Sequence, residues 1–413
     1  MAQVRRITIP PSLFAGSARI TGMRSLTSSG LVLVAMIAVL AGCGTPSTKP
    51  ATPPSTPTAS GSPLPTPTPD ACTNASVLAT WSLNQLAEQT LVIPVSETDV
   101  ASITPEIQAG AGGIILFGSS APTNLGEVLK TLTATAPGGI APLVMTDEEG
   151  GAVQRMANLV GSIPSARTMG ATMTPTQIQA LITTAAQKMR AAGITMDLAP
   201  VLDLDDGNGP NDQDPDGTRS FSLNANTTAA DAAAFATGLT AGGVIPVIKH
   251  FPGLGQATAN TDVKPATTVP WTTLEGAGLL PFKSAIAAGA PALMMANAVI
   301  PGLTTLPASI SPNAITGEVR GQLGFQGLVM TDSLSAGALA DIGYNVQKAV
   351  VAAITAGADM VLYTAAAASV ASLTSSTVAA LVAAVGAGTL DRSRLENAVG
   401  HILTIKNVNL CAA

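Results

Sequence analysis

Short apolar runs recur along the chain from residue 85 onward, and most of them end in polar residues. There are eight: LVIPV, GGIILFG, PLVMTDEE, GITMDLAPVLD, VIPVIKHFPG, ALMMAN, GLVMTDS and ADMVLYT. Several are apolar at every position, which is typical of parallel strands buried on both faces. Ala-rich stretches of helical character separate most of them, so the pattern predicts an α/β fold, a single-domain (β/α)8 barrel of the TIM type. The alternative is a doubly wound open sheet, although no glycine-rich phosphate-binding fingerprint follows any strand.

Polar residues gather where these runs end. They are Asp147, Asp203, Lys249, His250, Asn297 and Asp332. In a barrel these positions form the C-terminal rim, where active sites are assembled from separate loops. A single acidic residue at a strand end can simply cap the next helix. Six polar residues at converging strand ends predict a functional site instead.

Charge and composition exclude some classes of partner. The chain has 19 Lys and Arg against 25 Asp and Glu and a net charge of -6, with no basic cluster, so nucleic acid is not expected as a partner. Aromatic residues make up only 3%. A ligand must therefore be held mostly by polar contacts. We expect no cofactor and no metal, and a monomer.

The N-terminus has the pattern of an export signal. Arg24 supplies positive charge, Leu31 to Leu40 is a short apolar run, and Leu40-Ala41-Gly42-Cys43 resembles a bacterial lipobox. We therefore expect residues 1–42 to be a signal peptide and Cys43 to be lipidated, which would anchor an exported protein to the membrane surface. An ordinary secretory signal or an uncleaved anchor is the alternative. Met23, just before Arg24, is a second candidate start.

Residues 43–71 are almost purely Thr, Pro, Ser and Ala and predict a disordered linker, which leaves residues 72–413 as the folded domain. The lightly charged stretch from Ala349 to Leu390 contains Asp359 and repeated Gly, Thr and Ser. We interpret it as Ala-rich helices around a strand, with a membrane span as the alternative.

Cys72 and Cys411 stand near the two ends of this domain. In an oxidising compartment they are expected to form a disulfide; two free thiols are the alternative. A bridge that closes so long a loop stabilises by up to roughly 5 kcal/mol in the chain-entropy model.

Two of the strand ends carry residues suited to sugar chemistry. Asp332 ends the run GLVMTDS, where a rigidly held carboxylate could attack an anomeric carbon, although it could also cap the following helix. Lys249 and His250 precede the turn Phe251-Pro252-Gly253 and offer donors for hydroxyl groups. The other histidine, His401, lies on an Ala/Leu-rich C-terminal stretch and is expected to be structural.

The ordered set of motifs resembles glycoside hydrolase family 3, over roughly residues 85 to 405. These motifs are GAGGIILFG, TDEEGGAVQRM, GITMDLAPVLD, TRSFS, KHFPG and TDSLS. The chain is most similar to the short, single-barrel bacterial β-N-acetylglucosaminidases. The resemblance implies a retaining hydrolase with Asp332 as nucleophile. It also implies that five residues hold the sugar in the first subsite: Asp147, Arg155, Arg219, Lys249 and His250. Asp203 matches a supporting position.

The loop after KHFPG departs from the family. Single-barrel members continue with KHFPGHG and then Asp-Ser-His, whose Asp and His form the acid/base dyad. This chain has Leu254 in place of the first His and Asp262-Val263-Lys264 in the region of the dyad. Asn297 likewise stands where many members have a histidine. Asp262 is the tentative acid/base, or else a turn residue, while Lys264 is a weak acid at neutral pH.

The sequence thus leaves two main hypotheses. The first is a retaining hydrolase of β-linked N-acetylglucosamine or a related sugar, such as those of peptidoglycan and other cell-wall glycans. The second is a catalytically impaired, glycan-binding surface lipoprotein that keeps the sugar subsite. Transfer of the sugar to phosphate or another acceptor is a third interpretation, which no feature specifically supports.

Overall fold

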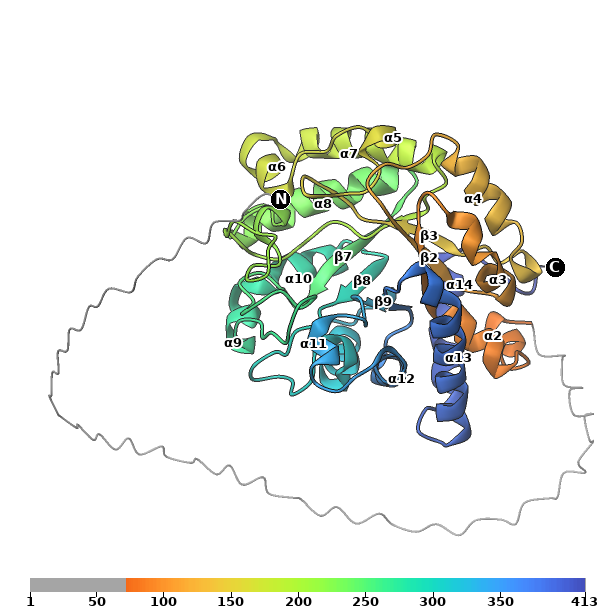
Figure 1. The fold of residues 1–413 in the computed structure, drawn as a ribbon. Coiled ribbons are helices and arrows are strands. Elements are labelled where there is room, and N and C mark those ends of the chain that lie inside the picture. The colour runs from red at the N-terminus through yellow and green to blue at the C-terminus, as the bar shows by residue number, and fades with distance from the viewer. Residues whose placement is uncertain (1–71, 413) are drawn as a thin grey trace, which may run out of the picture. The chain divides into compact units, whose positions relative to one another are not determined.

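The computed structural model describes residues 72–412 (Figure 1). The predicted signal peptide of residues 1–42, the lipidation site Cys43 and the linker up to residue 71 lie outside the described residues.

All eight apolar runs contain a strand of one parallel sheet. The strands are β1 (Leu91–Ser96), β2 (Gly113–Phe117), β3 (Leu143–Thr146), β6 (Met196–Asp197), β7 (Ile245–Phe251), β8 (Ala292–Met295), β9 (Leu328–Thr331) and β10 (Val361–Leu362). Their order is β10-β1-β2-β3-β6-β7-β8-β9, and Met330 pairs in parallel with Met360, so that β9 meets β10. The ring therefore closes, which confirms the predicted barrel and rules out the open sheet.

Successive residues of each strand face opposite sides of the barrel wall. The interior is filled by a compact group that includes Val92, Met145, Met294 and Met330. The neighbouring residues along the strands, such as Ile93, pack outward against the helices. Because both faces of the wall are buried, the strands are apolar at every position, as their sequence indicated.

Helices surround the strands (Figure 1). They are α1 (Asn74–Leu78), α2 (Leu83–Gln89), α3 (Thr104–Ala109), α4 (Leu125–Thr133), α5 (Ala157–Val160), α6 (Ala166–Thr172), α7 (Pro175–Ala191), α8 (Ala225–Ala241), α9 (Trp271–Thr273), α10 (Leu280–Ala287), α11 (Gly337–Ala340), α12 (Val346–Ala356), α13 (Val370–Gly386) and α14 (Arg392–Ile405), with a π-helix over Asn313–Gln322. Local signals explain several ends. The Thr174 side chain caps α7 in a capping box with Gln177, and Gly357 ends α12 in the left-handed conformation.

Small residues allow close helix packing. A Cβ atom at Gly242, directly after α8, would lie 2.3 Å from the Cβ of Ala186 on α7, and one at Gly238 would lie 2.8 Å from Ile182 Cβ. The glycines therefore let α8 approach α7 more closely than larger side chains would permit.

The two ends of the domain meet. Cys72 and Cys411 form a disulfide with a Cα separation of 5.8 Å, and the Asn74 side chain hydrogen-bonds to the backbone of Val408 and Leu410. These contacts join α1 to the segment after α14.

The chain from Ala349 to Leu390 forms helices around β10, as predicted. By length and composition only, Ala367–Gly386 is long and apolar enough to cross a membrane. Part of this helix is buried inside the described structure.

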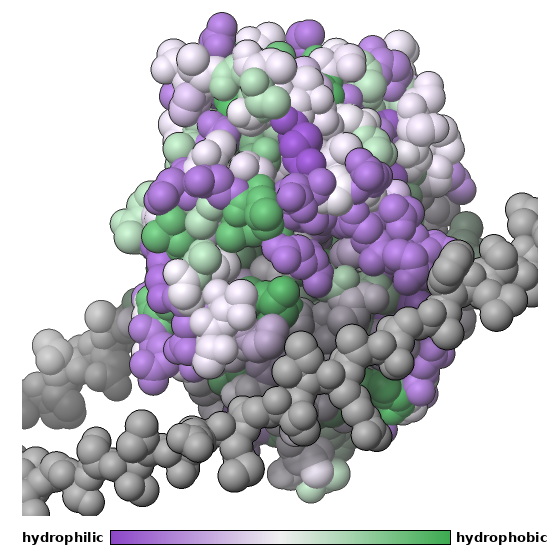
Figure 2. Space-filling model, turned by 90° about the vertical axis from the view of Figure 1, so that its left-hand side faces the viewer, coloured by the Kyte–Doolittle hydropathy of each residue, from purple (hydrophilic) through white to green (hydrophobic). Residues whose placement is uncertain are grey.

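One element was not predicted. A short antiparallel hairpin, β4 (Glu148–Gly150) and β5 (Val153–Gln154), follows β3 directly at the rim. The outer surface on the face shown in Figure 2 carries both hydrophilic and hydrophobic residues.

Candidate active site

A pocket of about 420 Å3 opens at the C-terminal end of the strands, and we call it the rim pocket. Its walls come from the ends of β2, β3, β7, β9 and β10 and from the loops that follow β6 and β7. Its charged and titratable residues are Asp147, Glu149, Arg155, Arg219, Lys249, His250, Asp262 and Asp332. The rim pocket thus brings together every catalytic and sugar-binding residue that the sequence suggested, and adds Glu149.

Lys249, at the end of β7, is buried to 2% exposure in the wall of the rim pocket. Its Nζ lies 2.9 Å from Asp147 Oδ1 and 2.6 Å from Glu149 Oε1. Burial alone would lower the pKa of Lys249, but the two carboxylates raise it above the usual value. Lys249 is therefore charged, and it fixes the position of both carboxylates.

Glu149 also holds Arg219. The Arg219 Nε and Nη2 atoms each donate to a Glu149 carboxylate oxygen at 2.8 Å, a bidentate pair. Burial raises the pKa of Glu149, but the charges of Arg219 and Lys249 outweigh it and hold the pKa well below the usual range. Glu149 was not predicted from the sequence as a site residue. The only signal was its place as the third of three consecutive acidic residues after β3, Asp147-Glu148-Glu149.

The neighbouring Glu148 has a different environment. Its Oε1 accepts from the backbone N–H groups of Arg155 and Met156, which closes the β4–β5 hairpin, while its Oε2 has no hydrogen-bond partner among the described residues. Burial raises the pKa of Glu148 to about 7. The hairpin in turn places Arg155, whose Nη2 lies 3.6 Å from Asp147 Oδ2 and whose guanidinium lies 5.7 Å from the Phe117 ring.

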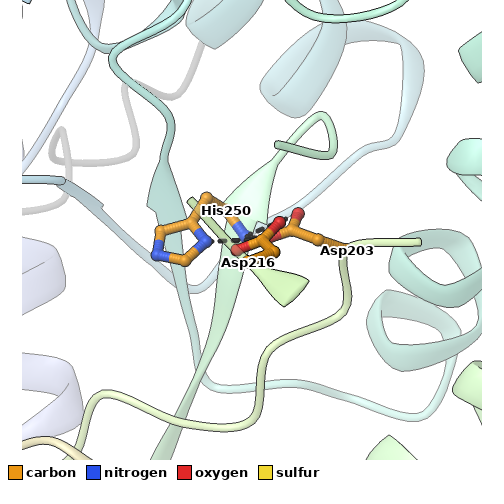
Figure 3. A group of neighbouring side chains, drawn as sticks. All are labelled: Asp203, Asp216 and His250. Carbon is orange, nitrogen blue, oxygen red and sulfur yellow. Dashed lines mark hydrogen bonds and ion pairs between the residues drawn. The ribbon is translucent and has the colours of Figure 1, made fainter. Parts of the chain in front are cut away.

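His250 is oriented from behind by Asp203, as drawn in Figure 3. Its Nδ1 lies 2.7 Å from Asp203 Oδ2, and Asp203 also accepts from the backbone N–H groups of His250 and Leu254. Burial and the positive charge of Arg219 lower the pKa of His250 to about 4, so the ring is neutral at pH 7. Nδ1 therefore donates to Asp203, and the Nε2 lone pair faces the Arg219 Nη2 atom at 3.4 Å. Asp203 is fully buried and does not line the rim pocket, in keeping with a supporting position.

Asp216 lies beside this pair and was not identified from the sequence (Figure 3). It is fully buried, and burial together with the charge of Asp203 raises its pKa well above the usual value. Asp203, Asp216 and His250 are the one group among the described residues whose metal-ligand atoms lie within 4.8 Å of one another. However, the Arg219 guanidinium already lies 3.6 Å from Asp216 Oδ1 and 3.4 Å from His250 Nε2. A divalent cation would meet that positive charge, so the group is better suited to orienting His250.

Asp332 directly follows β9 in the wall of the rim pocket. Its Oδ1 accepts from the Ser333 N–H at 2.7 Å, and Asn297 Nδ2 holds the Ser333 carbonyl at 2.7 Å. Burial raises the pKa of Asp332, with a further contribution from the charge of Asp262, while the positive charge of Lys249 opposes it. Asn297 is fully buried and does not line the rim pocket, so it supports the backbone around Asp332.

The loop that departs from the family pattern lines the rim pocket together with Asp332. Leu254 is 2% exposed and packs with Ala257, Ala296 and Ala298, so it contributes an apolar wall. Asp262 is exposed and lines the rim pocket, whereas Lys264 is exposed and does not line it.

Gly337 fixes the position of this loop. The backbone N–H groups of Gly337 and Ala338 donate to the carbonyls of Asp262 and Thr261, each at 3.0 Å. A Cβ atom at position 337 would lie 2.3 Å from the Val263 carbonyl oxygen. Only glycine therefore allows the loop to lie this close to the segment after Asp332.

The arrangement suits a polyhydroxylated ligand. Paired cations and carboxylates present donors and acceptors side by side, and a carboxylate at a strand end and one on a loop line the same pocket. Two carboxyl groups across one pocket are the groups that glycoside hydrolysis needs, one as nucleophile and one as acid/base.

Comparisons with known proteins agree with this chemistry. The sequence model of the glycosyl hydrolase family 3 N terminal domain matches residues 90–405. The beta-hexosaminidase LpqI of Mycobacterium tuberculosis is 34% identical over 347 residues, which cover 81% of this chain and 85% of the relative.

Solved structures give the same result. A family 3 glycosyl hydrolase from Mycobacterium smegmatis superposes with a TM-score of 0.72 at 33% identity, over 80% of this chain and 99% of that one. A beta-N-acetylhexosaminidase from Beutenbergia cavernae superposes with a TM-score of 0.71 at 34% identity, over 80% of this chain and 100% of that one. The fold, the matched residues and these relatives show that the chain belongs to glycoside hydrolase family 3.

Proposed function

We propose that this protein is a retaining β-N-acetylhexosaminidase that releases β-linked N-acetylglucosamine or a related sugar through a covalent ester on Asp332. The observation that carries the proposal is the placement of Asp332. Its carboxylate lies in the rim pocket beside Lys249 and His250 and is anchored by the N–H of Ser333. Such anchoring holds a nucleophile at a fixed position beneath a sugar ring.

The surrounding residues are assigned to the sugar. The Asp147 carboxylate, held by Lys249 and Arg155, can accept from ring hydroxyls, and the ring of neutral His250 lines the same pocket beside Arg219. Arg219, held by Glu149, offers its remaining N–H groups. These groups are fixed by one another before the ligand binds, which lowers the entropy cost of binding.

Asp262 is assigned to proton transfer. In the first step Asp332 attacks the anomeric carbon while the Asp262 carboxyl gives its proton to the departing glycosidic oxygen. In the second step Asp262 removes a proton from the water that attacks the ester, which frees the sugar and restores Asp332. Asp262 lines the same pocket as Asp332, and its charge contributes to the raised pKa of Asp332.

A second candidate function is glycan binding without turnover. It is favoured by the loop after KHFPG, which has Leu254 and Lys264 where the family has histidines and in which Asp262 is exposed. In that case the protein would bind the sugar in the rim pocket as a surface lipoprotein.

The place of action is proposed as the outside of the cell membrane. The lipobox-like segment ending at Cys43 supports a lipid anchor, and an anchored hydrolase there would reach peptidoglycan or other cell-wall glycans. Metabolic labelling with a fatty acid would test this anchor, since Cys43→Ser should abolish the label.

Kinetics on aryl N-acetyl-β-glucosaminides with good and poor leaving groups distinguish the two functions. We expect Asp332→Ala to lose activity on all of them. Asp262→Asn should lose about 10²- to 10⁴-fold on poor leaving groups and much less on activated ones. Azide should restore turnover of Asp262→Asn on an activated substrate, with a β-glycosyl azide as product. Binding of the sugar without any Asp332-dependent release, even from a nitrophenyl glycoside, would leave only the binding function.

A further inference from the structure

We propose that a second cavity beside the rim pocket binds the leaving group of the substrate and selects an apolar group that carries a hydroxyl or ammonium donor. This inference rests on the proposed hydrolase function, because it concerns the part of the substrate beyond the scissile bond.

The second cavity, which we call the side cavity, has a volume of about 520 Å3 and adjoins the rim pocket. Phe117, at the end of β2, and Thr364, just after β10, line both spaces. The side cavity extends from these two residues to α3 and the start of α13. A group attached to a sugar in the rim pocket can therefore continue into it across Phe117 and Thr364.

The chemistry of the side cavity differs from that of the rim pocket. Its walls are mostly apolar and include Val95, Ile103 and Val370. The titratable residues that line it are Asp99 and Glu106, with no lysine, arginine or histidine in its lining. An apolar surface with only negative charges disfavours an anionic group and suits a neutral or cationic one.

Glu106 supplies a specific hydrogen-bond acceptor. It is 7% exposed, and its Oε2 has no hydrogen-bond partner among the described residues. A buried carboxylate oxygen without a partner is costly, and a rotation of the Glu106 side chain toward the side cavity would let a hydroxyl or ammonium group of a ligand satisfy it. The side cavity therefore predicts low activity on substrates whose leaving group carries a free carboxylate, such as an unsubstituted muramic acid residue.

The test compares two substrates on variants of α13. Ala371 lines the side cavity, whereas the adjacent Ser372, which is also exposed, does not. Ala371→Trp should lower kcat/KM about tenfold for an N-acetyl-β-glucosaminide with an extended, hydroxyl-bearing apolar leaving group. It should leave kcat/KM unchanged for the glycosyl fluoride, whose leaving group does not reach the cavity. Ser372→Trp should change neither.

A second series tests the charge preference. Among aryl glycosides of matched leaving-group pKa, the wild type should prefer an ammonium-bearing group to a carboxylate-bearing one. Glu106→Gln should reduce the ratio of the two kcat/KM values about tenfold. Asp99→Asn, at an exposed residue of the cavity lining, should reduce this ratio less, and it replaces Glu106→Gln in the test if that variant does not fold.

The outcomes separate the two proposals. If no variant hydrolyses the glycosyl fluoride, the hydrolase function fails. If the fluoride is hydrolysed but Ala371→Trp affects both substrates equally or affects neither, the side cavity does not bind the leaving group. The same conclusion follows if the preference for the ammonium-bearing substrate is unchanged in both Glu106→Gln and Asp99→Asn.

Discussion

The two ends of the barrel each carry a cluster of arginine and histidine around buried aspartate, but the charges of the aspartates are satisfied differently at the two ends. At the N-terminal end the lower cluster consists of Arg320, Asp359, Arg394 and His401. Asp359 Oδ1 accepts from Arg394 at 2.7 Å and from His401 at 3.0 Å, and Oδ2 accepts from Arg320 at 2.5 Å and from the Val329 N–H at 2.9 Å. Every oxygen of this carboxylate thus has two donors.

At the rim the carboxylates are less well satisfied. Asp332 accepts one hydrogen bond from its neighbour's backbone, and among the described residues neither oxygen of Asp216 nor Oδ2 of Asp197 has a hydrogen-bond partner. Burial raises the pKa of all three groups. The comparison indicates that the lower cluster stabilises the fold, whereas the rim carboxylates have fewer hydrogen-bond donors; of these three, Asp332 is the one that lines the rim pocket and can meet a ligand.

The largest effect on stability is expected at the lower cluster. Asp359→Asn leaves two arginines without their buried counter-charge and should lower the free energy of unfolding by about 3 to 5 kcal/mol. The matched rim variant Asp332→Asn removes a carboxylate whose ionised form burial disfavours, and should change stability by less than about 1 kcal/mol. Urea denaturation of both variants measures this. Equal losses would contradict the division of roles.

A smaller effect is expected from Glu148, whose pKa is raised from 4.5 to about 7 in the folded protein. The folded state then holds a proton that the unfolded state releases, so the contribution of Glu148 to stability is present below pH 4.5 and is lost as pH rises to about 7. Glu148→Gln should therefore gain stability relative to the wild type across this window, by up to about 3 kcal/mol. A stability difference that does not depend on pH would refute the assignment.

Gly337 tests the loop at the rim. Gly337→Ala places a Cβ atom against the Val263 carbonyl and should displace Asp262. We expect kcat/KM to fall about tenfold or more for poor leaving groups, since small displacements of a reacting group are costly. The effect on activated substrates should be weaker. Full activity on poor leaving groups would show that Asp262 does not act from this position.

The smallest effect is expected on the helical shell. Gly400 lies within α14, and a Cβ atom there would meet no heavy atom within 4 Å. Gly400→Ala should raise the free energy of unfolding by about 0.5 to 1 kcal/mol and leave activity unchanged. A loss of stability would mean that the helix packs differently at this position.

The barrel could be predicted from the sequence because strands that are buried on both faces are apolar at every position. The site at the C-terminal rim could be predicted because polar residues directly follow those strands. It could not separate Glu148 from Glu149. The two are adjacent and chemically identical, and only the β4–β5 hairpin turns one toward its own backbone and the other toward Lys249 and Arg219.

Asp216 was missed for a related reason. It lies in an acidic loop where several aspartates cap backbone turns, and its approach to His250 depends on how that loop folds over the rim. Loop conformation is decided by tertiary contacts rather than by periodicity. The lower cluster was predicted only through His401, whose structural role the contact with Asp359 explains.

The most direct measurement of the central claim is covalent trapping of Asp332. A fluorinated N-acetylglucosaminyl fluoride slows the second step of a retaining mechanism more than the first, so the ester accumulates. Mass spectrometry of the digested protein should find one fluorosugar on the peptide that contains Asp332, and none in Asp332→Ala. If the sugar protects the protein against thermal unfolding but no adduct forms, or if the adduct lies on another residue, Asp332 is not the nucleophile.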